Sequence, residues 1–258
     1  MSKTALVTGA SAGIGRRFAR LLAKEGYNLV LVGRDEGRLI ETSDALTKEF
    51  GITAEVLRAD LSTEDGTELV EDRVSDPGRP VDVLINNAGF GIRESFLTSQ
   101  IISEEQLLDV LVRAPMRLMH SALPLMKERN SGIIINVSSV AGWIAGGTYS
   151  AAKSYLTVLS ESLHTELRAT NVNVLALCPG FTHTEFHQRG KMRMEALPKF
   201  MWLEADHVVA KAWSDARAGK ALSVPGWQYQ IVSSLARFAP RPLVRKIGMN
   251  VRVRQRRK

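Results

Sequence analysis

Short apolar runs without polar alternation are the feature that most restricts the fold of this chain. Two examples are Leu-Val-Leu-Val at 29–32 and Ile-Ile-Ile at 133–135. Strands of this kind are covered on both faces, as in a parallel sheet. Amphipathic helical segments separate them, which is typical of βαβ units. We therefore expect an α/β fold with a doubly wound, seven-stranded parallel sheet and helices on both of its faces.

The pattern predicts seven strands and six helices. The strands are expected at 4–8, 28–32, 54–58, 81–85, 133–137, 172–177 and 221–224. The helices are expected at 14–25, 36–49, 64–75, 104–128, 151–169 and 204–218. The fourth helix would open on a capping box, Ser103-x-x-Gln106. A chain of 258 residues fits one such domain, which we place at residues 1–230.

Positive charge is concentrated at the C-terminus. The net charge is +7, yet 231–258 hold nine basic residues and no acid, which leaves 25 basic against 27 acidic residues in the rest. Apolar residues are interspersed, so we expect a basic amphipathic extension at 231–258. Such a segment can lie on an anionic membrane. It can equally pack beside the body or at a subunit interface. No nucleic-acid-binding motif accompanies the charge.

A glycine-rich turn follows the first expected strand. Thr8-Gly9-Ala-Ser-Ala-Gly13-Ile-Gly15 leads directly into a helix. Glycine permits backbone conformations closed to other residues and lets N–H groups approach a pyrophosphate at a helix N-terminus. The turn therefore predicts a dinucleotide site.

Tyr149 and Lys153 lie four residues apart in an expected helix, on one of its faces. An ammonium beside a phenol is expected to lower the phenol's pKa from about 10. Such a pair could donate a proton to a carbonyl or accept one from an alcohol.

These motifs together resemble the short-chain dehydrogenase/reductase family in its NADP-preferring form. They occur in the family's order over residues 4–185: Thr-Gly-x-x-x-Gly-x-Gly, Asn86-Asn87-Ala88-Gly89, Ser139, Tyr149-x-x-x-Lys153 and Pro179-Gly180. The resemblance implies a single-domain Rossmann fold. It also implies an oxidoreductase that acts on CH–OH groups with NAD(P), as a homodimer or homotetramer. The single cysteine fits a reducing compartment, and we expect a cytoplasmic location.

The resemblance assigns roles to individual residues. Tyr149 is implied as the general acid/base, Lys153 as the residue that holds the nicotinamide ribose and lowers the tyrosine pKa, and Ser139, rather than Ser138, as the hydrogen-bond partner of the substrate oxygen. The implied cofactor contacts are Gly9, Ser11, Ala12, Gly13, Ile14, Gly15, Arg34, Asp60, Leu61, Asn87, Ala88, Gly89, Tyr149, Lys153, Pro179, Gly180, Thr182 and Thr184. Asp60 would border the adenine, or alternatively cap the helix that starts near Thr63.

The end of the second strand bears on the choice of cofactor. Gly33 stands where folds that prefer NAD carry an acid for the ribose 2′-hydroxyl. Arg34 follows, where a 2′-phosphate would sit, and Arg38 lies one turn later. We expect NADP(H) to be preferred. NAD(H) remains open because Asp35 is close and Ala12 replaces the basic residue of many NADP-preferring relatives. The alternative is that Arg34 is a solvated charge and Asp35 a helix cap.

Two features depart from the family. Ser139 and Tyr149 are ten residues apart, where about thirteen are common, so the loop 143–147 should leave the cleft more open. Leu111 occupies the position at which many relatives have an asparagine that organises a water relay to the lysine. A non-catalytic dinucleotide-binding protein, docked to a membrane or partner by its basic end, is therefore the alternative to an enzyme.

The segment 181–203 matches the family's substrate lid. Its methionines and aromatic residues would suit a hydrophobic ketone, such as a 3-oxoacyl, steroid- or retinoid-like compound, or the matching alcohol. His183 and His187 have a spacing that could hold a metal, but no further ligand is clustered near them and we expect no metal. Cys178, the single cysteine, is expected to be a small buried residue.

Overall fold

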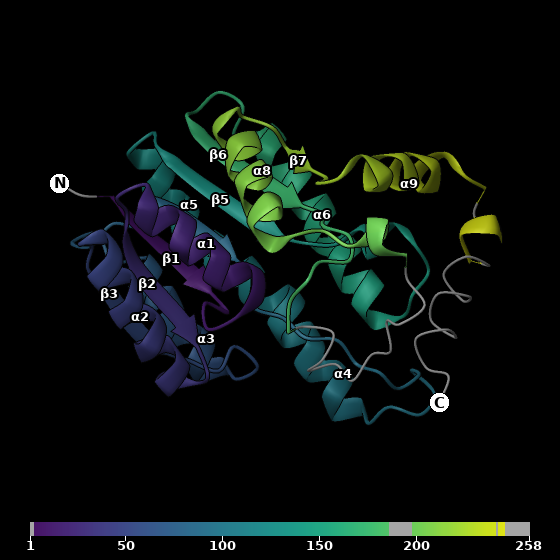
Figure 1. The fold of residues 1–258 in the computed structure, drawn as a ribbon, viewed down its shortest axis with the longest axis horizontal. Coiled ribbons are helices and arrows are strands. Elements are labelled where there is room, and N and C mark those ends of the chain that lie inside the picture. The colour runs from purple at the N-terminus through teal and green to yellow at the C-terminus, as the bar shows by residue number, and fades with distance from the viewer. Residues whose placement is uncertain (1–2, 186–197, 241, 246–258) are drawn as a thin grey trace.

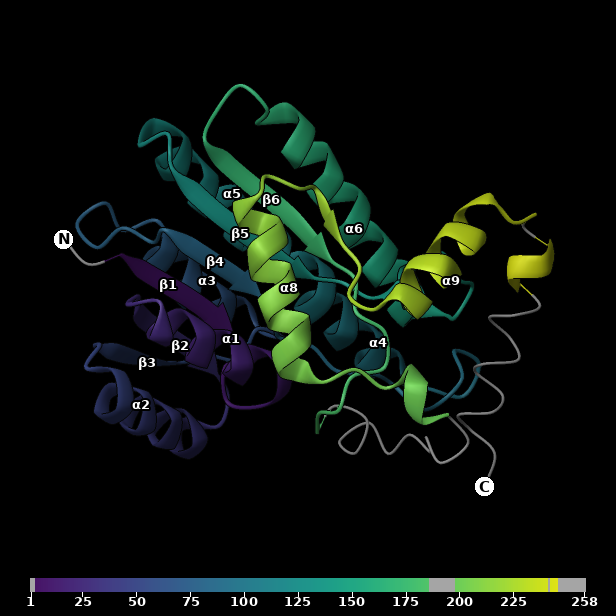
Figure 2. The same ribbon diagram turned by 45° about the horizontal axis from the view of Figure 1, so that its top comes forward.

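All the expected strands join one parallel sheet. The computed structural model describes residues 3–185, 198–240 and 242–245 (Figures 1 and 2). The seven strands follow the order β3-β2-β1-β4-β5-β6-β7. Their bounds are β1 Thr4–Thr8, β2 Asn28–Gly33, β3 Ala54–Arg58, β4 Val83–Asn86, β5 Gly132–Val137, β6 Val172–Leu177 and β7 Leu222–Ser223. The predicted fold is confirmed, with every strand end within two residues of its expected position.

Helices cover both faces of the sheet (Figure 1). They are α1 Gly13–Lys24, α2 Glu36–Phe50, α3 Glu64–Val74, α4 Ile101–Leu108, α5 Ala114–Glu128, α6 Thr148–Glu166, α8 Ala205–Arg217 and α9 Trp227–Phe238, with short η2 Val140–Trp143 and η3 Lys199–Met201. Phe18 of α1, Leu39 of α2 and Val208 of α8 belong to one buried cluster. Leu118 of α5 and Leu156 of α6 belong to the cluster on the other face, with residues of α3. Each face thus has its own core.

The expected helix at 104–128 is wrong in two respects. It begins earlier, at Ile101, with Gln100 as its N-terminal cap and no capping box at Ser103. It is also interrupted by a π-helical turn, η1 Asp109–Arg113, in which the Ala114 N–H donates to the carbonyl of Asp109. Pro115, within the first turn of α5, explains the interruption. Proline has no N–H for the carbonyl four residues earlier, and its ring crowds that carbonyl, so the helix widens there.

An unpredicted helix, α9, spans residue 230, where the sequence suggested that the domain ends and the extension begins. Figures 1 and 2 show it beyond the sheet, at the end of the molecule opposite β2 and β3. Glycine at 226, with a φ of +86°, turns the chain from β7 into this helix.

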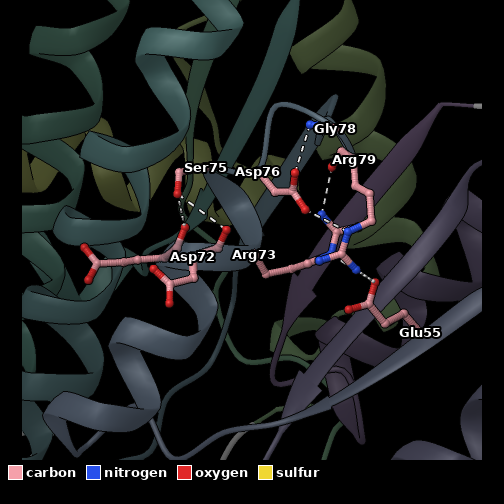
Figure 3. A network of polar contacts seen from close by, with 8 residues as sticks. Glu55, Asp72, Arg73, Ser75, Asp76, Gly78 and Arg79 are labelled. Atoms are coloured by element: carbon pink, nitrogen blue, oxygen red, sulfur yellow. Dashed lines mark hydrogen bonds and ion pairs between the residues drawn. The ribbon is translucent and has the colours of Figure 1, made fainter.

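A polar network fixes the chain between α3 and β4, at the amino ends of the strands (Figure 3). The buried Arg73 donates to Glu55 of β3 at 2.9 Å and to the carbonyl of Arg79 at 2.8 Å. Arg79 in turn pairs with Asp76 at 2.8 Å. These contacts hold the edge of the sheet opposite the site described next.

Candidate functional site

The predicted site residues meet at the carboxyl ends of the strands. The glycine turn follows β1, Arg34 follows β2, Asp60 and Leu61 follow β3, 87–89 follow β4, Ser139 follows β5, and 179–184 follow β6. The strand order reverses between β1 and β4. Ligands of open α/β sheets bind at such a switch point. All but Tyr149 and Lys153, which α6 supplies, therefore come from this one edge.

The glycine turn is shaped to hold an anion. Gly9 and Gly13 have φ values of +66° and +53°, which favour glycine. The N-terminus of α1 has no side-chain cap and no acid in its first turn, whereas Asp35 caps α2 and Thr63 caps α3. Its N–H groups are thus directed to a site that suits a phosphate. The residues present fit the pyrophosphate of a dinucleotide.

Two side chains that bridge β1 and β4 set the position of this turn. The hydroxyl of Thr8 accepts from the N–H groups of Asn87 and Ala88 at 2.9 and 3.0 Å and donates to the carbonyl of Ile85 at 3.2 Å. Asn87 Nδ2 donates to the carbonyl of Thr8 at 2.8 Å. A Cβ on Gly9 would lie 2.8 Å from that Nδ2. Thr8 was identified from the sequence only as the start of the glycine motif and was assigned no role, although a hydroxyl immediately before the first glycine was a signal for one.

The two adjacent serines after β5 face different groups. Ser138 is buried, and its Oγ donates to the carbonyl of Lys153 at 2.7 Å and lies 2.7 Å from Thr157 Oγ1. Ser139 is half-buried and accepts from the N–H of Ala141 at 3.1 Å, and its hydrogen bonding acts to lower the pKa of the Tyr149 phenol. Ser139 is therefore the serine that acts on Tyr149, and Ser138 is a link between β5 and α6.

Burial controls the protonation of Tyr149 and Lys153. Dehydration raises the pKa of Tyr149 to about 12, against the opposing effect of the Ser139 hydrogen bond. Burial lowers the pKa of Lys153 to about 8. Lys153 Nζ donates to the carbonyl of Val137 at 2.6 Å and lies 5.7 Å from the centre of the Tyr149 ring. The expected lowering of the tyrosine pKa is thus wrong, because dehydration has the largest effect on this phenol and outweighs the hydrogen bonding of Ser139.

Leu111 lies in the π-helical turn and is buried beside the site. Its Cδ2 is 2.7 Å from where a Cβ of Gly89 would be, and that Cβ would lie 4.0 Å from Lys153 Nζ. A small cavity between these residues is lined by Leu111, Lys153 and Asn86 among others. The buried Asn86 Oδ1 has no hydrogen-bond partner within the described chain. A polar acceptor therefore lies close to the apolar Leu111.

The charges after β2 are only partly engaged by the protein. Asp35 accepts from the Arg38 N–H at 3.2 Å, which confirms it as the cap of α2. The Arg38 guanidinium pairs with Glu185 at 2.9 Å, across from β2 on the segment after β6. Arg34 is exposed beside them. Asp60 does not cap α3; it accepts from the N–H and hydroxyl of Ser62 at 3.0 and 2.8 Å.

The chain after β6 is held by pairing with the end of the lid. Thr182 and Leu203 form a parallel bridge. Tyr229 of α9 accepts from the Phe181 N–H at 3.0 Å and donates to the Met201 carbonyl at 2.5 Å. Thr184 lies against Gly13, 3.3 Å from the position of a Cβ there. Sequence reasoning missed Tyr229, because the helix that carries it was not predicted.

Several predictions concern residues outside the described ranges: 186–197 of the lid, His187, Arg241 and all of the basic residues after Arg245. His183, within the described chain, stacks on Trp202 with ring centres 4.6 Å apart. The described residues contain no cluster of three or more metal-ligating side chains. Among them, too, no helix has the length and apolar character needed to cross a bilayer. Cys178 is buried as expected, and burial raises its pKa to about 11.

Comparison with known proteins agrees with this geometry. The family model described as "short chain dehydrogenase" matches residues 3–194. The chain belongs to the short-chain dehydrogenase family. It is therefore an oxidoreductase that acts on CH–OH groups, and NAD or NADP is the family's cofactor.

Three similar proteins can be compared with this short-chain dehydrogenase. The "Ketoacyl reductase HetN" of Nostoc sp. is 34% identical over 92% of this chain and 82% of its own length. A short-chain dehydrogenase from Sphingobium yanoikuyae in complex with NADPH is 30% identical, with a TM-score of 0.83 over 91% of this chain and 93% of its own. Another, from Burkholderia phymatum in complex with NAD, is 26% identical, with a TM-score of 0.79 over 91% and 92%.

The two serines give a matched test of the short-chain dehydrogenase site. Ser139→Ala should lower kcat for carbonyl reduction roughly 10- to 100-fold, since a hydrogen bond to a charged group is worth about 1.5–3 kcal/mol. Ser138→Ala should leave kcat nearly unchanged but lower the free energy of unfolding by about 1–3 kcal/mol, because it removes a buried link to α6. Urea unfolding and NADPH oxidation measure the two effects. Reversed results would exchange the roles of the serines.

Proposed function

We propose that this protein is an NADP(H)-dependent reductase of hydrophobic ketones, or a dehydrogenase of the matching secondary alcohols. The observation that carries the proposal is the placement of three groups at the same edge as the glycine turn. Tyr149 and the buried Lys153 lie one turn apart on α6, and Ser139 after β5 acts on the Tyr149 phenol. A hydroxyl, a phenol and an amine so arranged can hold a carbonyl oxygen and supply its proton.

Each group has a separate task in the proposed reaction. The reduced nicotinamide supplies the hydride for the carbonyl carbon. Ser139 holds the carbonyl oxygen, and Tyr149 gives that oxygen the phenolic proton. Lys153 faces the phenolate that remains and, as in the family, binds the nicotinamide ribose. The uncapped N-terminus of α1 binds the pyrophosphate, and 87–89 with 179–184 close the site.

The pKa of Tyr149, about 12, favours reduction as the faster direction at neutral pH. The phenol is then almost fully protonated, which is the form that donates to a carbonyl. Alcohol oxidation needs the phenolate, so its rate is expected to rise with pH while reduction falls or stays level.

The hydrophobic substrate class is supported by the surroundings of Tyr149. The side chain packs with Phe90, Ile92 and Leu111 in a small apolar cluster. Phe181 and Trp202, at the base of the lid, lie with ring centres 6.1 Å apart. The name of the Nostoc relative, a ketoacyl reductase, points to the same chemistry. We propose 3-oxoacyl, steroid- or retinoid-like ketones as the compounds to examine.

NADPH oxidation across a panel of such ketones tests the function. Turnover of at least one apolar ketone, and none of small polar ones, is the expected result. If NADPH binds tightly but no ketone is reduced, the protein is a dinucleotide-binding protein without this activity, and the proposal is wrong.

The cofactor preference rests on Arg34 and Arg38, which lie where a 2′-phosphate would meet β2 and α2. Arg34→Ala should raise the KM for NADPH about tenfold and leave that for NADH unchanged, since a charge-assisted hydrogen bond is worth about 1.5–3 kcal/mol. Arg20→Ala is the matched control, because Arg20 is an exposed arginine that pairs with Glu49 at 2.5 Å. An equal loss for both cofactors in Arg34→Ala would contradict the preference for NADP(H).

We further propose a homodimer or homotetramer that pairs through the outer faces of α5 and α6, as is common in the family. Met116 and Tyr155 are exposed on these helices and contact each other, with Val158 exposed one turn away. The single buried thiol, Cys178, fits a cytoplasmic location.

A further inference from the structure

Helix α9 has one face fixed to the body of the protein. Tyr229 is buried, and its hydroxyl joins the Phe181 N–H to the Met201 carbonyl. Gln228 Nε2 donates to the carbonyl of Phe200 at 3.0 Å. The Arg237 guanidinium lies 4.7 Å from the centre of the Trp143 ring in η2. The helix is thus held at both ends, so its outward face has a fixed orientation.

That outward face is a stripe of large apolar side chains. Trp227, Ile231, Leu235 and Phe238 are 67%, 53%, 66% and 89% exposed. Spacings of four, four and three residues place them along one side of the helix. Soluble monomers seldom expose so many large apolar groups together without a binding role. The stripe is therefore expected to be a binding surface.

Charge identifies the occupant. From Trp227 to Lys258 the sequence contains nine basic residues and no acid, while the preceding part of the chain carries a small net negative charge. A second copy that paired through α9 about a two-fold axis would bring the nine positive charges of each chain together, which opposes association. An anionic lipid surface offers both an apolar layer for the stripe and negative headgroups for the cations.

We propose that the stripe formed by Trp227, Ile231, Leu235 and Phe238 docks this protein on the surface of an anionic phospholipid bilayer. The helix lies in the interfacial plane with these side chains among the acyl-chain ends, and the net positive charge of the sequence from 227 onward favours anionic headgroups. Arg237 and Tyr229 are on other sides of α9, which remain against the body.

Vesicle co-sedimentation of the full-length protein tests the proposal. Wild type should bind phosphatidylcholine vesicles that contain phosphatidylglycerol, bind pure phosphatidylcholine weakly, and lose affinity as salt is added. Leu235→Ser and Phe238→Ser should each lower the affinity for the anionic vesicles by at least about tenfold, because each removes a large apolar side chain from the contact. Leu69→Ser, which alters an apolar residue 45% exposed on α3, is the control and should bind like wild type.

Two further measurements make the result decisive. The tryptophan emission should move to shorter wavelengths with the anionic vesicles, because Trp227, which is 67% exposed, would enter the apolar layer. Thermal unfolding of Leu235→Ser should match wild type because the side chain is exposed. Equal vesicle binding by wild type and both stripe variants would overturn the proposal, as would equal binding to both kinds of vesicle. A fall in the sedimenting mass of Leu235→Ser without lipid would also overturn it, because the stripe would then be a contact between copies.

Discussion

Tyr149→Phe is expected to lower kcat for ketone reduction by about 10²- to 10⁴-fold, the usual contribution of a positioned general acid. The phenylalanine ring fills the same space among Phe90, Ile92 and Leu111, so only the hydroxyl is lost. The variant therefore also lacks the hydroxyl on which Ser139 acts. Steady-state NADPH oxidation with an apolar ketone measures the change.

The control for this variant is cofactor binding. Fluorescence titration with NADPH should give Kd values for Tyr149→Phe and wild type within a few-fold, because the glycine turn and the N-terminus of α1 are untouched. Tyr155→Phe is the matched substitution on the same helix, where the hydroxyl is exposed and contacts Met116. It should retain full activity. Undiminished turnover in Tyr149→Phe would contradict the assignment of the proton donor.

The second large effect is on stability, through the buried Lys153. Its pKa is about 8 in the folded protein against 10.5 in the unfolded chain, so between these values the unfolded chain binds more protons. Stability must therefore rise with pH in this window. The loss of folding free energy caused by burying the charged Lys153 is complete below pH 8, and it disappears above pH 10.5. Between pH 8 and 10 wild type should gain about 2 kcal/mol relative to Lys153→Met, given about 1.4 kcal/mol per pKa unit.

Lys153→Met is the proper reference because it retains every other titrating group. Cys178, whose pKa burial raises to about 11, and Tyr149, at about 12, oppose the trend at high pH and cancel in the difference. Urea unfolding of both proteins at several pH values gives the difference in free energy of unfolding. A difference that stayed constant from pH 8 to 10 would mean that Lys153 is fully charged in the folded protein.

The sheet could be predicted almost completely because its strands are buried on both faces and read as continuous apolar runs. The sequence also indicated the glycine turn and the asparagine after β4, since each reflects a local backbone requirement. It indicated the Tyr149–Lys153 pair because residues four apart lie on one face of a helix. Their convergence could be inferred from topology, because carboxyl ends of parallel strands share one edge.

Other features depend on contacts that sequence does not display. The pKa of Tyr149 is set by the water excluded around it, which the i, i+4 spacing to Lys153 cannot indicate. The break at η1 was signalled by Pro115 but overlooked within a long apolar pattern. Helix α9 was interpreted as part of a charged extension because the contacts of Gln228 and Tyr229 that hold it to the body are visible only in the structure. The role of Thr8 was not predicted because it consists of hydrogen bonds that join the ends of β1 and β4.

Tyr229 has a practical consequence for any shortened form of the protein. Its hydroxyl hydrogen-bonds both to the segment that follows β6 and to the segment that precedes α8. Its ring fills the space that a side chain at Gly180 would need. Removing α9 together with the basic residues would therefore loosen the chain after β6, which carries the proposed cofactor contacts 179–184. A truncation meant to remove only the charged residues should end after Phe238, so that changes in lipid binding and in catalysis can be measured separately.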